Sequence, residues 1–140
     1  MSTTVAGGTS LTQQRNLVTE IPGPRSQEKL ARKKQYVADG VGTTLPVFVE
    51  AAGGGVILDT DGNTLIDLGS GIAVTTVGNA APSVVARVQE QVAAFTHTCF
   101  MVTPYDGYVD VCAALAELTP GEHAKKSAPI AAMSTPTCAV

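Results

Sequence analysis

Hydrophobic and polar positions first alternate regularly after Pro46. Residues 46–52 (PVFVEAA) and 55–60 (GVILDT) are rich in β-branched and aliphatic side chains, and glycines separate the two segments. An Asp-Gly-Asn turn signal follows, and residues 64–68 (TLIDL) alternate again. Tight turns between such segments are typical of antiparallel hairpins. This part of the chain therefore predicts a three-stranded β-meander.

Helical periodicity marks three further segments. Hydrophobic residues recur at steps of three and four over residues 82–95, and Pro82 suits the first position of a helix. A second such segment spans residues 105–118 and ends at a Thr-Pro-Gly sequence. Before the predicted sheet, a helix is expected to begin directly after Ser26, its N-cap, and to end at Gly40. Its hydrophobic stripe is narrow, so we expect it on a surface or against a partner.

The two ends of the chain differ from the part between them. Residues 1–20 are small and polar, and they are predicted to form a flexible tail. Residues 129–140 (PIAAMSTPTCAV) have no charge, no hydrophobic period and two prolines. They are predicted to be an aberrant tail that does not continue the preceding domain.

Composition and charge narrow the class of protein. The 140 residues carry a net charge of −3 and 15% charged residues, without the basic stripe of a nucleic-acid-binding protein. No hydrophobic run approaches the roughly 20 residues of a membrane span, and the N-terminus does not resemble a signal peptide. We therefore expect a cytoplasmic protein. Aromatic residues make up only 4% and tryptophan is absent, so another segment is expected to supply part of the core.

Cysteines and histidines do not form a recognisable metal-binding pattern. The three cysteines are odd in number and irregularly spaced, which predicts reduced thiols rather than disulfides. Together with the two histidines they lack the spacing of a zinc site, and no metal is expected. The residues concerned are His97, Cys99, Cys112, His123 and Cys138.

The run TLIDLGSGIAVTTVGNAAP (residues 64–82) raises the question of nucleotide binding. Gly69-Ser70-Gly71 follows a predicted strand, where dinucleotide-binding proteins place a glycine-rich loop. However, Val74 occupies the position of the third glycine, and the chain has no Gly-Lys-Ser/Thr sequence. A G-x-S-x-G nucleophile elbow is also absent from the run. The run is therefore interpreted as a small-residue bend whose backbone closely approaches a helix or a ligand.

Several short phrases, taken in order, resemble a known family. D-x-D-G-N-x-x-I-D-L, G-I-A-V, F-T-H-T and P-Y-x-x-Y occur in that order between about Arg15 and Ala128. Together they resemble the start of the class-III pyridoxal-phosphate-dependent aminotransferases, and they are most similar to the branch that acts on 4-aminobutyrate. The resemblance implies transfer of an amino group from 4-aminobutyrate to 2-oxoglutarate with pyridoxal 5′-phosphate as cofactor. It also implies a homodimer.

The same resemblance implies an α/β transferase of fold type I, of which this chain is an incomplete N-terminal part. Residues 21–80 would be the N-terminal part of the small domain, with a helix and the β-meander. Residues 81–128 would be helices that lead into the large cofactor-binding domain. Ile72 matches a position that walls the substrate side of the cofactor, and the segment around Met101 also approaches the active site. Both residues are therefore expected to bind substrate.

Other parts of the family's chemistry have no counterpart in this sequence. In the family a lysine forms the Schiff base, an aspartate pairs with the pyridinium nitrogen, and a glycine-rich loop binds the phosphate. No lysine of the chain matches the Schiff-base lysine, and the phosphate-binding loop is expected just after Ala128. We therefore expect no catalytic and no cofactor-binding residue here. Three interpretations stay open: an aminotransferase for 4-aminobutyrate, another ω-amino acid or ornithine; an inactive fragment made by a shifted reading frame or a genuine gene end; and a small interaction module.

Overall fold

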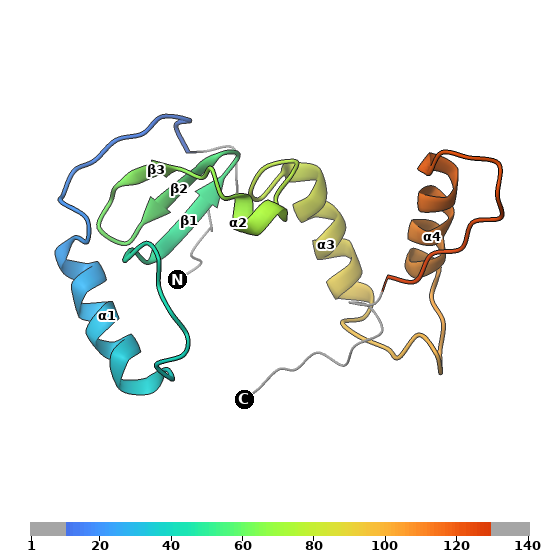
Figure 1. Ribbon diagram of the computed structural model, residues 1–140, viewed down its shortest axis with the longest axis horizontal. Coiled ribbons are helices and arrows are strands. Elements are labelled where there is room, and N and C mark those ends of the chain that lie inside the picture. The colour runs from blue at the N-terminus through green and yellow to red at the C-terminus, as the bar shows by residue number, and fades with distance from the viewer. Residues whose placement is uncertain (1–10, 130–140) are drawn as a thin grey trace. The chain divides into compact units, whose positions relative to one another are not determined.

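The computed structural model describes residues 11–129, which fall into two compact units divided between Gln89 and Glu90. We call residues 11–89 the first unit and residues 90–129 the second unit. The elements, in chain order, are α1 (Pro24–Tyr36), β1 (Val49–Gly53), β2 (Val56–Asp59), β3 (Thr64–Ile66), α2 (Ser70–Ala73), α3 (Pro82–Ala94) and α4 (Asp106–Leu118) (Figure 1). The fold is mixed α/β with one small antiparallel sheet.

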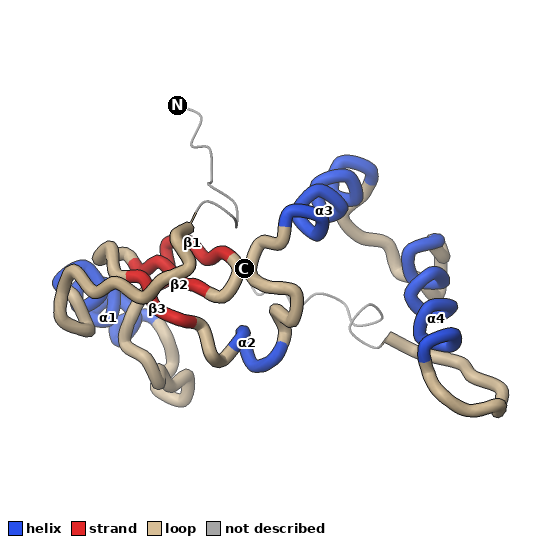
Figure 2. Tube along the Cα trace, turned by 90° about the horizontal axis from the view of Figure 1, so that it is seen from above, coloured by secondary structure: helices blue, strands red, loops and turns tan. Residues whose placement is uncertain are grey.

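The three strands form the predicted meander. β1 pairs antiparallel with β2, and β2 pairs antiparallel with β3, so the spatial order follows the chain (Figure 2). Gly53 lies opposite Val56 across the first turn, and Leu58 lies opposite Thr64 across the second. The strands are shorter than the alternating segments that predicted them, but their order and pairing are confirmed.

Asn16, in the segment before α1, pairs with the edge of the sheet. Asn16 and Thr64 exchange two backbone hydrogen bonds of 3.0 and 2.8 Å. An edge strand presents unpaired backbone groups, and this segment satisfies some of them on β3. Asn16 and Thr64 thus pair within the segment 1–20 that was predicted to be a flexible tail, and the first ten residues lie outside the described part of the chain.

The start of α1 differs from the prediction. Ser26 is not the N-cap but lies fully buried within the first turn, while Gly23 occupies the cap position and Pro24 opens the helix. Asp61, in the turn after β2, supplies the capping oxygens: its carboxylate accepts hydrogen bonds of 2.8 and 3.0 Å from the backbone N–H groups of Arg25 and Ser26. A Cβ atom on Gly23 would lie only 2.4 Å from the Asp61 side chain. The capping partner is thus distant in sequence and could not be identified from local spacing.

The other helix ends follow the sequence more closely. α3 and α4 lie within one residue of the ranges predicted from hydrophobic periodicity. α1 ends at Tyr36 rather than at Gly40, because Val37 already adopts an extended conformation (φ −104°, ψ 133°). None of the helices between residues 11 and 129 has the length and hydrophobicity needed to cross a bilayer.

Polar side chains form most of the buried interior of the first unit. Among the described residues Val56 is the only buried hydrophobic side chain, whereas Asp59 and Asn63 are almost completely buried. The Asn63 side chain accepts hydrogen bonds of 2.8 and 2.9 Å from the backbone N–H groups of Val18 and Thr19, and its amide donates to the Asp59 carboxylate at 2.8 Å. This network joins the N-terminal segment to the turn between β2 and β3.

Aromatic rings organise the second unit around the start of α4. Phe100 stacks on Tyr108 with ring centroids 4.0 Å apart, and Tyr105 meets Phe95 and Phe100 edge to face at 5.6 and 5.5 Å. Such edge-to-face and stacked pairs are favourable geometries for aromatic quadrupoles. Yet no residue of α4 is buried, so ring contacts stabilise this unit without an enclosed core.

Candidate functional site

The bend that carries Ile72 has an unusual backbone. The four residues of α2 all have positive φ: 46° at Ser70, 60° at Gly71, 61° at Ile72 and 62° at Ala73. The left-handed region costs an L-residue with a side chain roughly 1–2 kcal/mol, and three of these four residues carry one. The bend is therefore strained, and the surrounding structure must hold it in place.

Asp67 holds the two sides of this bend. Its Oδ1 accepts hydrogen bonds from the backbone N–H groups of Gly69 at 3.1 Å and Ser70 at 2.8 Å. Its Oδ2 accepts a hydrogen bond of 3.2 Å from the side-chain amide of Asn79. One carboxylate thus connects the residues that enter the bend with the segment that leaves it.

The departing segment is fixed to the turn between β1 and β2. Asn79 and Gly54 exchange two backbone hydrogen bonds of 2.8 and 3.0 Å. Gly78, at φ +92°, approaches so closely that an added Cβ would lie 3.1 Å from the Cα of Gly54. Gln13 holds the same turn from the other side, donating to the Gly53 carbonyl at 2.9 Å and accepting from the Gly55 N–H at 3.0 Å. The sequence predicted a close backbone approach to a helix or a ligand, whereas Gly78 approaches this turn instead.

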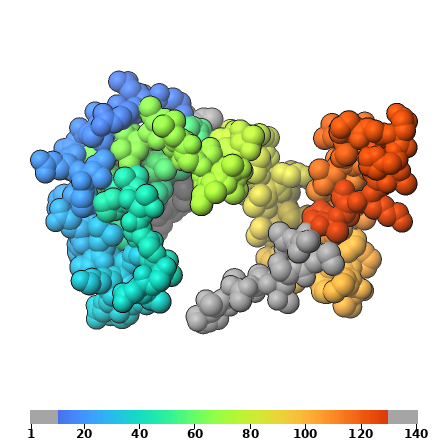
Figure 3. All heavy atoms as spheres, viewed as in Figure 1, coloured from blue at the N-terminus to red at the C-terminus, as the bar shows by residue number. Residues whose placement is uncertain are grey.

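The hydrophobic side chains of the bend are exposed. Ile72 is 94% exposed, and Leu68, Val74 and Val77 are also largely accessible. Figure 3 shows this light-green segment at the surface of the first unit. A strained, fixed bend thus presents Ile72 and its hydrophobic neighbours outward.

Met101, the second residue expected to contact substrate, lies in a turn of the second unit. The N–H groups of Val102 and Thr103 both donate to the Cys99 carbonyl at 2.9 Å. The Met101 side chain is 72% exposed. Ile72 and Met101 therefore belong to different units, and each is presented to solvent by a hydrogen-bonded turn.

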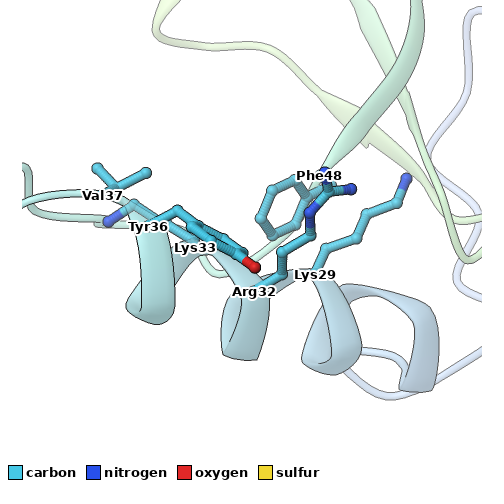
Figure 4. A pocket seen from close by; sticks show the side chains of 6 residues that line it. All are labelled: Lys29, Arg32, Lys33, Tyr36, Val37 and Phe48. Carbon is cyan, nitrogen blue, oxygen red and sulfur yellow. The ribbon is translucent and has the colours of Figure 1, made fainter.

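A groove with several cationic side chains runs along α1. Its volume is about 470 Å³, and Figure 4 shows the side chains that line it. The Lys29 ammonium lies 5.9 Å from the centre of the Phe48 ring and donates to the Thr60 hydroxyl at 2.8 Å. The Lys33 ammonium donates to the Val41 carbonyl at 2.5 Å. The lining residues are Lys29, Arg32, Lys33, Tyr36, Val37 and Phe48.

This groove does not fit pyridoxal 5′-phosphate. Its cations could meet a phosphate, but none of the described lining residues is an acid that could pair with the pyridinium nitrogen. Lys29 and Lys33 are hydrogen bonded to neighbouring protein oxygens. A Schiff-base lysine must instead present a free amine to the cofactor. The residues present therefore do not form a cofactor site here.

The described residues also show no grouping for a metal ion. Between residues 11 and 129, no three His, Cys, Asp or Glu side chains gather closely enough to bind one. Cys99 and Cys112 are not joined to each other in the structure, and Cys138 lies outside the described residues.

Comparison with known proteins decides the family. The family described as "Aminotransferase class-III" matches residues 36–140 of the chain. This chain belongs to the class-III aminotransferases. The match confirms the resemblance found in the short phrases. It also includes residues 129–140, which the sequence had predicted to be an aberrant tail.

Individual relatives also match most of the chain. The 4-aminobutyrate aminotransferase of Mycobacterium tuberculosis is 64% identical over 118 residues, which are 84% of this chain and 26% of the relative. The 5-aminovalerate aminotransferase of Pseudomonas putida is 40% identical over 73% of this chain and 24% of its own length. An alanine/serine racemase of Pyrococcus horikoshii is 34% identical over 78% of this chain and 23% of its own length. The chain thus spans about a quarter of the length of these relatives.

Sequence analysis missed the residues that hold the bend. A local signal existed for Asp67, because aspartate followed closely by glycine and serine often accepts hydrogen bonds from backbone N–H groups two and three residues later. No local signal existed for Asn79 or Gly54, since their pairing joins two turns that are distant in sequence.

Proposed function

We propose that this chain forms the N-terminal part of a pyridoxal 5′-phosphate-dependent aminotransferase of fold type I. The proposed reaction transfers an amino group from 4-aminobutyrate to 2-oxoglutarate. The observation that carries the proposal is 64% identity, over 84% of the chain, to a protein named 4-aminobutyrate aminotransferase. Family membership supports the reaction class and the cofactor, and the relative's name supports the substrate.

Within this enzyme, Ile72 and Met101 are proposed to face the substrate. Both side chains are hydrophobic and exposed, and both lie on hydrogen-bonded turns. Such side chains can pack against the aliphatic part of an ω-amino acid and exclude water from the reacting amine. Their role is binding and shaping of the site, since neither side chain can transfer a proton.

The cofactor is proposed to be held by segments other than the described residues 11–129. The described residues do not combine a free lysine amine with a carboxylate for the pyridinium nitrogen in the groove along α1. The enzyme is further proposed to act as a homodimer. On its own, the 140-residue chain is therefore proposed to be inactive.

The amino donor is the part of the proposal that most needs a direct test. 4-Aminobutyrate and 5-aminovalerate differ by one methylene, and both names occur among the relatives. One methylene in a hydrophobic pocket is discriminated by only about 10- to 200-fold. A preference for 5-aminovalerate or ornithine would keep the reaction class and change the substrate.

The test assays the native protein that contains this segment. With pyridoxal 5′-phosphate and 2-oxoglutarate present, glutamate formation is measured with 4-aminobutyrate, 5-aminovalerate and ornithine in separate reactions. We expect the highest kcat/KM with 4-aminobutyrate, and no glutamate from any donor would overturn the proposal. The 140-residue chain, mixed with the cofactor, should show no absorbance band that disappears when amine is added.

A further inference from the structure

We propose that Asp67 is a positioning residue that holds Ile72 toward the substrate. The inference rests on the proposed function, because it assigns Asp67 a role in the same substrate site. Asp67 does not need to touch substrate for this role. It acts through the backbone of the bend that carries Ile72.

The hydrogen bonds of the bend begin at the two residues that Asp67 binds. Asp67 accepts from the N–H groups of Gly69 and Ser70. The carbonyl of Gly69 then accepts from Ile72 at 2.8 Å and from Ala73 at 3.1 Å. Because each step depends on the orientation of the preceding peptide, a change at the Asp67 carboxylate is transmitted directly to Ile72.

Asp67 itself is anchored to the sheet. Its backbone N–H donates to the Gly55 carbonyl at 2.9 Å. The other carboxylate oxygen binds Asn79, whose backbone pairs with Gly54 in the same turn. The carboxylate thus connects a rigid turn to a bend that is strained in isolation. This is the arrangement expected of a group that fixes the conformation of a binding loop.

Side-chain chemistry distinguishes aspartate from its nearest replacement. A carboxylate can accept from Gly69, Ser70 and Asn79 at once, because it has only acceptor oxygens. In Asp67→Asn, one oxygen remains for the two backbone N–H groups, while the new amide competes as a donor at Asn79. Asp67→Ala removes both carboxylate oxygens and therefore all three of these hydrogen bonds. We therefore expect Asp67→Asn to retain part of the function and Asp67→Ala to retain less.

The structural half of the test uses amide hydrogen exchange on the 140-residue chain. In Asp67→Ala, exchange at Gly69, Ser70 and Ile72 should accelerate by about tenfold, because the bonds that close the bend are lost. Exchange within α1 reports whether the unit still folds. Asp39→Asn, an exposed acid outside the bend, is the matched control and should leave all of these rates unchanged.

The functional half uses the native enzyme and a double-mutant cycle. Asp67→Ala should raise KM for 4-aminobutyrate by about tenfold with a smaller change in kcat, as expected for a misplaced hydrophobic contact. If Asp67 acts through Ile72, then Asp67→Ala should add little in an Ile72→Ala background. A merely stabilising role would give the same effect in both backgrounds.

The outcomes separate the two claims. Active native enzyme with additive effects of Asp67→Ala and Ile72→Ala would overturn the positioning role and leave the proposed function standing. Unchanged amide exchange at Gly69 and Ser70 in Asp67→Ala would also overturn it. Native enzyme that forms no glutamate from any donor would overturn the proposed function, and with it the positioning of Ile72 toward substrate by Asp67.

Discussion

The carboxylate of Asp61 accepts a 3.0 Å hydrogen bond from the backbone N–H of Ser26, 35 positions earlier in the chain. It thereby caps α1 from the turn after β2. Burial raises the pKa of Asp61. However, the adjacent Ser26 hydroxyl, whose geometry falls short of a hydrogen bond, the N–H groups of Arg25 and Ser26, and the Arg25 charge all lower it. The net effect is a pKa below the ordinary 3.8.

This relationship predicts a pH-dependent stability. Because the folded-state pKa of Asp61 is lowered, its contribution is fully present above pH 3.8 and is lost as the pH falls through the folded-state value. Asp61→Ala should therefore lower the unfolding midpoint at pH 7. Below the folded-state pKa of Asp61, the variant and the unmodified chain should have the same urea unfolding midpoint. Circular dichroism at 222 nm during urea unfolding measures both, and an equal difference at pH 7 and below the folded-state pKa of Asp61 would contradict the cap.

The buried Asn63 side chain makes a second prediction. Asn63→Ala leaves the N–H groups of Val18 and Thr19 and one oxygen of Asp59 without their partner. We expect the free energy of unfolding to fall by at least about 2 kcal/mol. Asn16→Ala is the matched control, because the pairing of Asn16 with β3 uses its backbone. It should change stability by less than about 0.5 kcal/mol. Equal effects would show that the buried network is not the stabilising feature.

The close approach of Gly78 to Gly54 leads to a third prediction, on stability. An added Cβ at Gly78 meets backbone, and its φ of +92° is unfavourable for alanine. Gly78→Ala should therefore destabilise the chain by more than about 1 kcal/mol in urea unfolding. Gly55→Ala adds the same methyl group where nothing lies within 4 Å. That control should be neutral or slightly stabilising, and a similar loss in both variants would count against the contact.

Ionisation of the Tyr108 phenol is expected to make the stability of the aromatic cluster depend on pH. Burial, followed by the nearby Cys112 and Tyr105 groups, raises the pKa of Tyr108 above its usual value of about 10. A raised pKa means that the neutral phenol stabilises the fold below pH 10, and this contribution is lost as the pH rises through the folded-state value. Near-ultraviolet circular dichroism should therefore show alkaline loss of the ring contacts. In Tyr108→Phe the loss should no longer follow phenol ionisation.

The proposed substrate contacts make a fifth prediction, on the native enzyme. Ile72→Ala and Met101→Ala should each raise KM for the amino donor by about tenfold, because each removes a hydrophobic contact. Val41→Ala truncates a hydrophobic, exposed side chain that belongs to neither turn. Steady-state kinetics with varied 4-aminobutyrate separates the variants. A Val41→Ala enzyme as impaired as the other two would show that the effect is not specific to the site.

The local pattern of residues along the sequence was enough to predict some structural features but not others. The alternation at residues 46–68 predicted the meander, and the three- and four-residue period of α3 and α4 predicted both helices, because each signal is repeated along a single segment. The start of α1 was predicted wrongly at Ser26, since serine is a strong cap by type but the actual cap, Asp61, comes from another turn. The same reason explains why Asn79 was missed.

The amino-acid sequence by itself determined the strands, the two C-terminal helices and the family. These follow from periodic hydrophobicity and from short phrases in a definite order. Only the tertiary structure decided that Asn16 pairs with β3, that Asp61 caps α1, and that Asp67 binds the left-handed bend that carries Ile72. In each case a polar group is hydrogen bonded to a backbone group. That partner lies far away in the sequence, or it belongs to a bend whose conformation is unfavourable for its residue types. Such hydrogen bonds produce no periodic pattern in the sequence, because their geometry arises only when separate turns come together in the folded chain.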